Sequence, residues 1–197
     1  AGVKRFVFAS SGGAIYGECD APVAEDAPRQ PLSPYGVSKL AGEEYLAAYN
    51  RLYGARHVAL RYGNVYGPRQ DPHGEAGVVA IFFGKLAEGE APRIFGDGSQ
   101  TRDYVYAGDV ARATLAATGQ DGGVFNVGTG RETSVVELYE ACRRVAGSSV
   151  EAEPAPARLG ELQRSVLDVS LAARELGWRP EVSLEEGLRL TWESFSS

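Results

Sequence analysis

A tyrosine and a lysine lie four residues apart in the segment PLSPYGVSKLAGEEYL, at Tyr35 and Lys39. Residues with this spacing share one face of a helix, with Cβ atoms about 5–6 Å apart, so the ammonium can lie beside the phenol. A unit positive charge about 5 Å away stabilises a phenolate by roughly 3 kcal/mol at an effective dielectric constant of about 20. The pair is therefore a candidate for a phenol that gives and takes a proton near neutral pH. Ordinary helix packing is the alternative, and the spacing alone does not exclude it.

The flanking residues predict the helix that positions this pair. Ser33 is a good N-cap, Pro34 suits the first helical position, and Gly54 is a stop signal. Apolar segments on either side, Val3–Ala9 and His57–Tyr62, predict strands. Strand, helix and strand in this order indicate a βαβ crossover, and hence a mostly parallel sheet.

Helices and strands alternate through the rest of the chain, so the predicted fold class is α/β. Two capping boxes predict helix starts, one at Ser134 with Glu137 and one at Ser183 with Glu186. No internal repeat or long linker is present, so two lobes, if they exist, are interleaved along the chain. We expect further helices at 76–86, 108–118, 134–146 and 170–178 and from Ser183 onward, and strands within 92–106, at 124–128 and at 166–169.

Composition excludes several classes of protein. The 197 residues are 44% hydrophobic and 23% charged, which suits one globular domain or one large and one small lobe. The net charge is −6 and no basic run occurs, which argues against nucleic acid or an anionic membrane as a partner. Cys19 and Cys142 lie far apart without metal-ligand spacing, so we expect reduced thiols, no metal site and a cytoplasmic location. The longest apolar run, Gly77–Gly84, is too short to span a bilayer.

The chain contains no methionine and opens on AGVKRFVFASS, which reads as a strand already under way. We therefore expect this sequence to be part of a longer polypeptide.

Five segments in order, SSGGAIYGE, SPYGVSK, LRYGNVYGPRQ, TRDYVYAGDV and FNVGTG, resemble the NAD-dependent epimerase/dehydratase family of extended short-chain dehydrogenases/reductases. Within that family the resemblance is strongest to the UDP-glucose (UDP-galactose) 4-epimerases. It implies the C-terminal part of a doubly wound, Rossmann-like parallel sheet and a smaller α/β substrate-binding lobe. The NAD-binding part would be 1–66 and 107–130, and the interleaved UDP-sugar lobe 67–106 and 131–197. The Gly-rich turn that holds the NAD diphosphate in family members is not in this chain.

The resemblance also assigns residues to the cofactor. Tyr35 is the expected acid/base, and Lys39 favours the ionised phenol and binds the nicotinamide ribose. Tyr62 is expected to flank the nicotinamide, and Ser10 to belong to the same cofactor site.

A second catalytic hydroxyl of the family falls, by counting back from Tyr16, at Gly12, which has no side chain. We expect Ser11 to take that role. Family dehydratases carry Asp-Glu where this chain has Gly13 and Ala14, so dehydration is disfavoured.

Five residues are assigned to the UDP-sugar by resemblance. Asn64, Arg102 and Arg158 are expected on the diphosphate, where a guanidinium fork can hold two oxygens at once. Glu161 is expected on the uridine ribose. Ser165 falls where family members carry a residue that limits the size of the sugar C2 substituent, and a small serine would admit an N-acetyl group.

Structural alternatives stay open for three of these residues. Asn64 could stabilise a turn at the end of a strand. Arg102 could form a surface ion pair with Asp103 or Asp109, and Ser165 could simply begin a strand.

The implied activity is NAD-dependent epimerisation at C4 of a UDP-hexose, namely UDP-glucose, UDP-galactose and their N-acetyl forms, by transient hydride transfer. One alternative is another extended reductase or dehydratase that acts on a nucleotide sugar. A second is a fragment that binds a nucleotide sugar without turnover, because it lacks the NAD diphosphate turn. By analogy with the family, a homodimer that uses the helix from Ser33 to Tyr53 is a further expectation.

Overall fold

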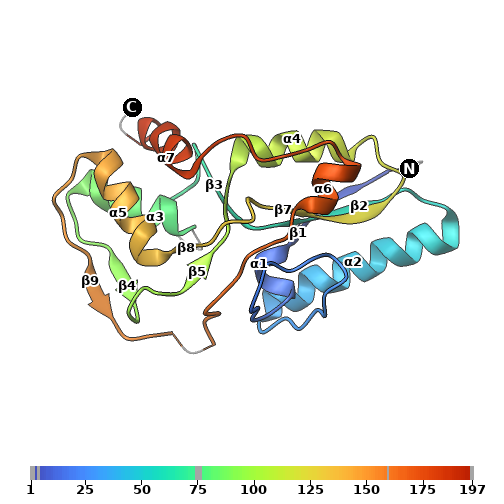
Figure 1. Ribbon diagram of the computed structural model, residues 1–197, viewed down its shortest axis with the longest axis horizontal. Coiled ribbons are helices and arrows are strands. Elements are labelled where there is room, and N and C mark those ends of the chain that lie inside the picture. The colour runs from blue at the N-terminus through green and yellow to red at the C-terminus, as the bar shows by residue number, and fades with distance from the viewer. Residues whose placement is uncertain (1–2, 4, 74–76, 159, 196–197) are drawn as a thin grey trace.

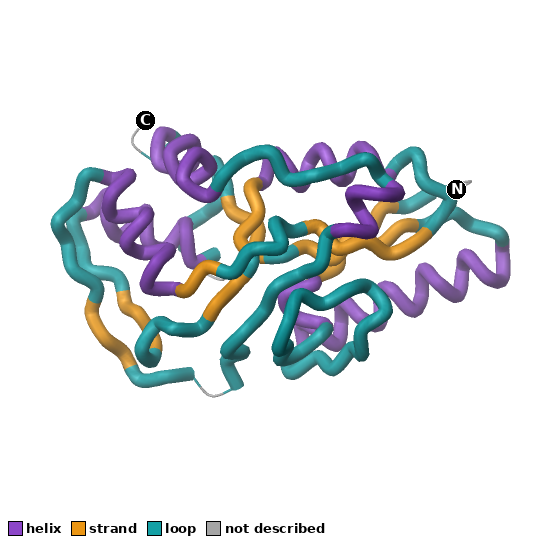
Figure 2. The backbone as a smooth tube through the Cα atoms, in the orientation of Figure 1, coloured by secondary structure: helices purple, strands orange, loops and turns teal. Residues whose placement is uncertain are grey.

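A three-stranded parallel sheet in the order β1-β2-β7 forms one half of the molecule (Figure 1). This computed structural model describes residues 3, 5–73, 77–158 and 160–195. Helix α2 covers one face of the sheet, and helices α4 and α6 cover the other (Figures 1 and 2). The predicted βαβ crossover and parallel sheet are therefore confirmed. The bounds are β1 Val7–Ser11, α2 Pro34–Tyr53, β2 Val58–Tyr62, α4 Ala107–Ala117, β7 Gly123–Val127 and α6 Ser170–Glu175.

Helix α2 begins and ends at the residues that the sequence predicted. The Ser33 side chain accepts a hydrogen bond from the backbone N–H of Gly36, and Pro34 occupies the first turn. Gly54 ends the helix in the left-handed region at φ 61°, which glycine adopts at little cost. The strand that follows, β2, starts one residue later than predicted.

The predicted strand Val3–Ala9 is wrong at both ends, because β1 covers Val7–Ser11. At its start, the Arg5 guanidinium is bound to a backbone carbonyl and a carboxylate that follow α4. At its end, Ser10 and Ser11 continue the parallel ladder with β2. Polar side chains at these positions are tolerated because the hydroxyl of Ser10 is satisfied by a buried carboxylate.

Two further segments differ from prediction. The residues after β1 form a one-turn helix, α1 (Gly12–Ile15), where a loop was expected. The predicted strand at 166–169 does not form, since Val23 and Leu167 pair only through an isolated bridge and the chain turns into α6 three residues after Leu167.

The other half of the molecule consists of helices α3, α5 and α7 with three pairs of short strands (Figure 1). Strands β3 and β6 pair in parallel, as do β4 and β9, whereas β5 and β8 are antiparallel. The bounds are β3 Asn64–Tyr66, α3 Val78–Glu88, β4 Arg93–Phe95, β5 Thr101–Arg102, β6 Tyr104–Tyr106, β8 Thr133–Ser134, α5 Val135–Ala146, β9 Glu153–Ala155 and α7 Leu184–Glu193.

The capping signals of α5 and α7 behave differently. Ser134 and Glu137 form the predicted capping box, with both reciprocal hydrogen bonds. Ser183 caps α7 by accepting from the backbone N–H of Glu186, but the Glu186 carboxylate binds Arg189 instead. A capping box therefore fixes α5, and a single capping bond fixes α7.

Each half has its own apolar core. The core around the parallel sheet includes Ala172 and Trp178, which come from the segment 131–197 assigned by sequence to the second lobe. The division of the chain into lobes at the stated boundaries stays a prediction. Main members of the first core are Val58, Leu60, Val105, Ala113, Ala117, Phe125 and Val127, and of the second Val79, Phe82, Phe83, Tyr139, Leu138 and Leu188.

Candidate functional site

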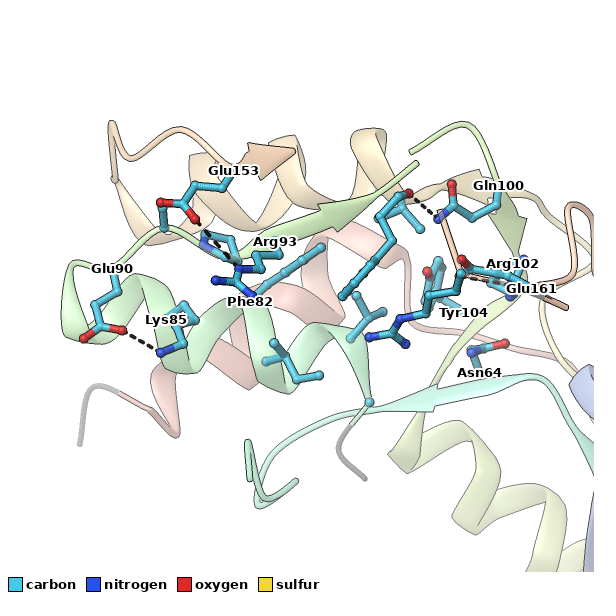
Figure 3. A pocket seen from close by; sticks show the side chains of 18 residues that line it. Asn64, Phe82, Lys85, Glu90, Arg93, Gln100, Arg102, Tyr104, Glu153 and Glu161 are labelled. Atoms are coloured by element: carbon cyan, nitrogen blue, oxygen red, sulfur yellow. Dashed lines mark hydrogen bonds and ion pairs between the residues drawn. The ribbon is translucent and has the colours of Figure 1, made fainter. Parts of the chain in front are cut away.

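A cleft of about 870 Å³ opens between α3, β4 and the segment that follows β9 (Figure 3). It brings together four of the five residues predicted to bind substrate, from three separate parts of the sequence. In Figure 3, Arg102, Glu161 and Asn64 lie at one end of the cleft, and the ion pairs of Lys85 and Arg93 lie at the other. The four predicted residues are Asn64, Arg102, Arg158 and Glu161.

Arg102 lies beside Glu161 at one end of the cleft. Its Nη2 lies 3.8 Å from Oε1 of Glu161, and its Nη1 donates to the backbone oxygen of Thr101 at 2.8 Å. The alternative in which Arg102 pairs with Asp103 or Asp109 is therefore wrong. A half-buried guanidinium in this position is suited to an anion that presents two oxygens.

Arg158 lies at the rim of the cleft over an aromatic ring. Its guanidinium carbon is 3.8 Å from the centroid of the Phe95 ring, a cation–π contact. Stacking holds the exposed side chain against the cleft wall. Leu159, the residue after Arg158, lies outside the described residues.

Tyr104 is a cleft residue that the sequence reasoning missed. Its hydroxyl is buried in the wall, and it has no hydrogen-bond partner among the described residues. Burial raises the pKa of Tyr104 to about 12, so the phenol stays a neutral donor. This hydroxyl is therefore a candidate donor to a molecule bound in the cleft. The signal was present in TRDY, because Arg102 and Tyr104 alternate along an extended segment and so share a face.

Asp103 points away from the cleft, between these two residues. Its carboxylate accepts from the backbone N–H groups of Thr129 at 2.7 Å and Gly130 at 3.0 Å. Burial raises the pKa of Asp103, and the hydrogen bonds from Thr129 and Gly130 oppose that shift. The residue therefore fixes the cleft wall to the turn that follows β7.

Tyr35 and Lys39 lie together at the start of α2, beside the carboxyl end of β1. The Nζ atom of Lys39 is 5.4 Å from the Tyr35 ring centroid, and it donates to the backbone oxygen of Ala9 at 2.9 Å. The Tyr35 side chain is 55% exposed. The pair is thus adjacent, as the spacing predicted, and its phenol is accessible to a ligand.

Helix α1 lies between this pair and the cleft. A Cβ built on Gly36, next to Tyr35, would lie 2.5 Å from the backbone oxygen of Ala14. A Cβ built on Gly13 would lie 3.3 Å from Oδ1 of Asn64 and 3.9 Å from Oγ of the buried Ser165. One turn of helix therefore links the first turn of α2 to the cleft.

Gly12, where the resemblance places a hydroxyl residue, has little room for a side chain. A Cβ at this position would lie 2.7 Å from a methyl carbon of Leu167 and 3.2 Å from the backbone oxygen of Arg61. Ser11 ends β1, is half-buried, and is the N-cap residue of α1, although its side chain makes no capping bond in the described structure. Its predicted catalytic role stays a prediction.

Tyr62 and Ser10, which were both predicted to bind the cofactor, do not lie beside the exposed side chain of Tyr35. The Tyr62 side chain lies on the α4 face of the sheet, opposite α2, with its hydroxyl 3.0 Å from Oγ1 of Thr114. Ser10 is 3% exposed, and its hydroxyl donates to Glu43. Cofactor roles for Tyr62 and Ser10 stay predictions.

Fold and site together define an α/β protein with a ligand cleft beyond the carboxyl ends of its parallel strands, the usual location in open α/β sheets. A family model described as the NAD dependent epimerase/dehydratase family matches residues 1–128. The chain belongs to this family. The expected Rossmann-like class is thereby confirmed.

Relatives of known name support the same family. The chain is 52% identical over 198 residues to the UDP-glucose 4-epimerase of Mycolicibacterium smegmatis, covering 99% of this chain and 63% of that protein. It is similar to the structure of UDP-glucose 4-epimerase with UDP-glucose from Thermotoga maritima, with a TM-score of 0.97 and 51% identity over 99% of this chain and 64% of that one. It is also similar to the Thermus thermophilus UDP-glucose 4-epimerase complex with NAD, with a TM-score of 0.94 and 48% identity over 100% of this chain and 65% of that one. The chain spans less than two thirds of the length of these relatives.

Proposed function

We propose that the complete protein containing this chain epimerises UDP-hexoses at C4 with NAD as cofactor. The observation that carries the proposal is the contact of α1 with both the Tyr35–Lys39 helix and the arginine-lined cleft. A sugar nucleotide whose diphosphate lies in the cleft can thereby present its sugar toward the phenol. The names of the similar proteins support the substrate class.

The residues present fit one end of NAD. The exposed Tyr35 phenol and the neighbouring Lys39 ammonium can each hydrogen-bond one hydroxyl of a ribose. The Gly-rich turn for the diphosphate is not in this sequence, so the fit covers the nicotinamide ribose alone. When bound, NAD supplies hydride acceptance from C4 and its return.

The protein's own residues handle the proton and the position of the sugar. Tyr35 would take the proton of the C4 hydroxyl, and Lys39 would stabilise the phenolate form of Tyr35 that accepts it. Arg102 and Arg158 would hold the diphosphate, and Glu161 would hold the uridine ribose. Rotation of the 4-keto sugar before Tyr35 returns the proton would give the other epimer.

Ser165 supports a finer substrate assignment, to the N-acetyl forms as well as the plain sugars. Its side chain is small and buried, and its Oγ lies 3.9 Å from the position that a Cβ on Gly13 would occupy. A small side chain at this position therefore leaves room for a larger substituent at C2 of the sugar.

Another extended reductase on a nucleotide sugar would keep the same Tyr–Lys pair, so the products must decide between the two activities. A dehydratase is disfavoured because Gly13, which faces Asn64, offers no carboxylate to eliminate water.

The test is Tyr35→Phe in the complete protein, with UDP-glucose and UDP-galactose interconversion as the assay. Turnover should fall by a factor on the order of 100 to 10,000, the usual contribution of a general acid–base group, with UDP-glucose affinity within a few-fold of wild type. Unchanged turnover would rule out Tyr35 as the base. Release of a reduced or dehydrated sugar by the wild type would favour the alternative enzymes.

We also propose a homodimer through α2, supported by exposed apolar side chains on that helix. Tyr45 is 71%, Leu52 73% and Tyr53 73% exposed. Sedimentation of the complete protein, with Leu52→Lys as the disrupting variant, tests this. No helix among the described residues is both long and apolar enough to span a membrane, and a cytoplasmic location stays a prediction.

A further inference from the structure

Helix α2, which carries Tyr35 and Lys39, has no large apolar side chain that is fully buried. Only Gly36 and Glu43 are buried among the residues of this 20-residue helix, and Leu40 packs partly buried against the cluster around Ile15. Large apolar side chains such as Tyr45 and Leu52 face outward. The position of α2 along the sheet therefore depends on its polar contacts as well as on this packing.

The deepest of these contacts is an ion pair between Glu43 of α2 and Arg61 of β2. Nη2 of Arg61 lies 2.6 Å from Oε2 of Glu43, and Nε lies 3.0 Å from Oε1. Both side chains are only 2% exposed. Two parallel bonds fix the direction as well as the distance between the helix and the strand.

The same guanidinium holds the end of α1. Nη1 of Arg61 donates to the hydroxyl of Tyr16 at 2.7 Å and to the backbone oxygen of Glu25 at 2.9 Å. Tyr16 is the C-cap residue of α1, and its hydroxyl donates onward to Asn126 at 2.8 Å. Arg61 therefore connects the helix that carries the phenol to the helix that borders the cleft.

Helical spacing relates this pair directly to the phenol. Tyr35, Lys39 and Glu43 are four residues apart in turn, so they form one stripe on α2. Lys39 contacts the backbone of Ala9 and Glu43 contacts the hydroxyl of Ser10, which are consecutive residues of β1. A shift of α2 that breaks the Glu43 contacts must also move Lys39 and Tyr35.

We propose that Glu43 and Arg61 are positioning residues, which set the place of α2 on the sheet and so the place of the Tyr35 phenol relative to α1. The catalytic part of this inference rests on the proposed function, in which Tyr35 is the base. A displacement of about 1 Å at a reacting group can cost on the order of 100-fold in rate. The pair itself need not stabilise the fold, because buried ion pairs are often replaceable by apolar residues without loss of stability.

Two variants of the complete protein test the proposal. Glu43→Asp keeps the charge pair but shortens the arm by one methylene. The double variant Glu43→Leu/Arg61→Met removes the pair and fills its volume with apolar atoms. For both we expect kcat for UDP-glucose to fall about 10- to 100-fold, with KM changed less than about three-fold. Backbone amides of residues 36–43 should exchange with deuterium faster than in the wild type. The melting temperature should stay within about 5 °C in Glu43→Asp, and it should fall further in the double variant, which leaves the buried Ser10 hydroxyl without its carboxylate partner.

Asp109→Asn is the matched control. Asp109 is 1% exposed and accepts from the backbone N–H groups of Glu181 and Val182, on the face of the sheet opposite α2. This variant should lower the melting temperature while kcat and exchange at 36–43 stay within about two-fold of wild type.

Wild-type kcat and exchange in both pair variants would overturn the proposal, as would a rise in KM without faster exchange. If the double variant does not fold, Glu43→Asp decides by the same measurements. If the wild type does not interconvert UDP-hexoses, the proposed function has failed, but the exchange comparison still decides whether the pair positions α2.

Discussion

Replacement of Lys39 by methionine removes one charge while keeping most of the side-chain volume. Nζ lies 5.4 Å from the centroid of the Tyr35 ring, which corresponds to roughly 3 kcal/mol of phenolate stabilisation at an effective dielectric constant of about 20. Because Tyr35 is 55% exposed, solvent screening reduces this to about 1–2 kcal/mol. At about 1.4 kcal/mol per factor of ten, kcat should fall about 5- to 30-fold.

The assay is kcat for UDP-galactose formation in the complete protein at one fixed pH, with saturating cofactor. Lys39→Arg keeps the charge and serves as the control, with kcat within about two-fold of wild type. A kcat for Lys39→Met equal to that of wild type would refute the electrostatic role of Lys39. Equal losses of kcat in both variants would leave Lys39 only its contact with the Ala9 carbonyl.

Three further outcomes are expected. Ser11→Ala should lower kcat by a factor on the order of 100 with KM unchanged, as for the loss of one donor to a reacting oxygen, and an unaltered kcat would show that Ser11 has no such role. Ser165→Tyr should lower kcat/KM for UDP-N-acetylglucosamine about 10- to 200-fold relative to UDP-glucose, and equal losses for both sugars would mean that Ser165 is not the gate. Cys19 and Cys142 are buried, and burial raises the pKa of both thiols, so a thiol reagent should label neither in the native protein and both after unfolding; rapid native labelling would contradict this.

The elements that the sequence predicted best are those whose ends are determined by the residues at those ends. Helix α2 starts at Ser33 and Pro34 and stops at Gly54, because capping and the left-handed conformation depend on the residue itself. Helix α1 was missed because a Gly-Gly start opposes helix propensity. Its Ile15 packs in a buried cluster with Leu167, which is distant in the sequence.

The residues of the candidate site were likewise predicted in part and missed in part. Motif order located Arg102 and Glu161, and the structure places them side by side. The burial of Glu43 was missed, because a glutamate within a helix normally faces solvent. The usable signal was Arg61, a charge near the end of the apolar strand HVALRY, which requires a buried partner.

The alternation at TRDY makes the length of this segment as important as its composition. Arg102 and Tyr104 face the cleft, while Asp103 faces the turn after β7. An insertion or deletion of one residue would turn every side chain beyond it to the opposite side. The Asp103 carboxylate would then enter the cleft, and an arginine or a phenol would meet the N–H groups of Thr129 and Gly130. A substitution in this segment changes one side chain at a time, whereas a change in its length alters all the following side chains at once. Homologous chains should therefore vary in loop length on either side of this segment and not within it.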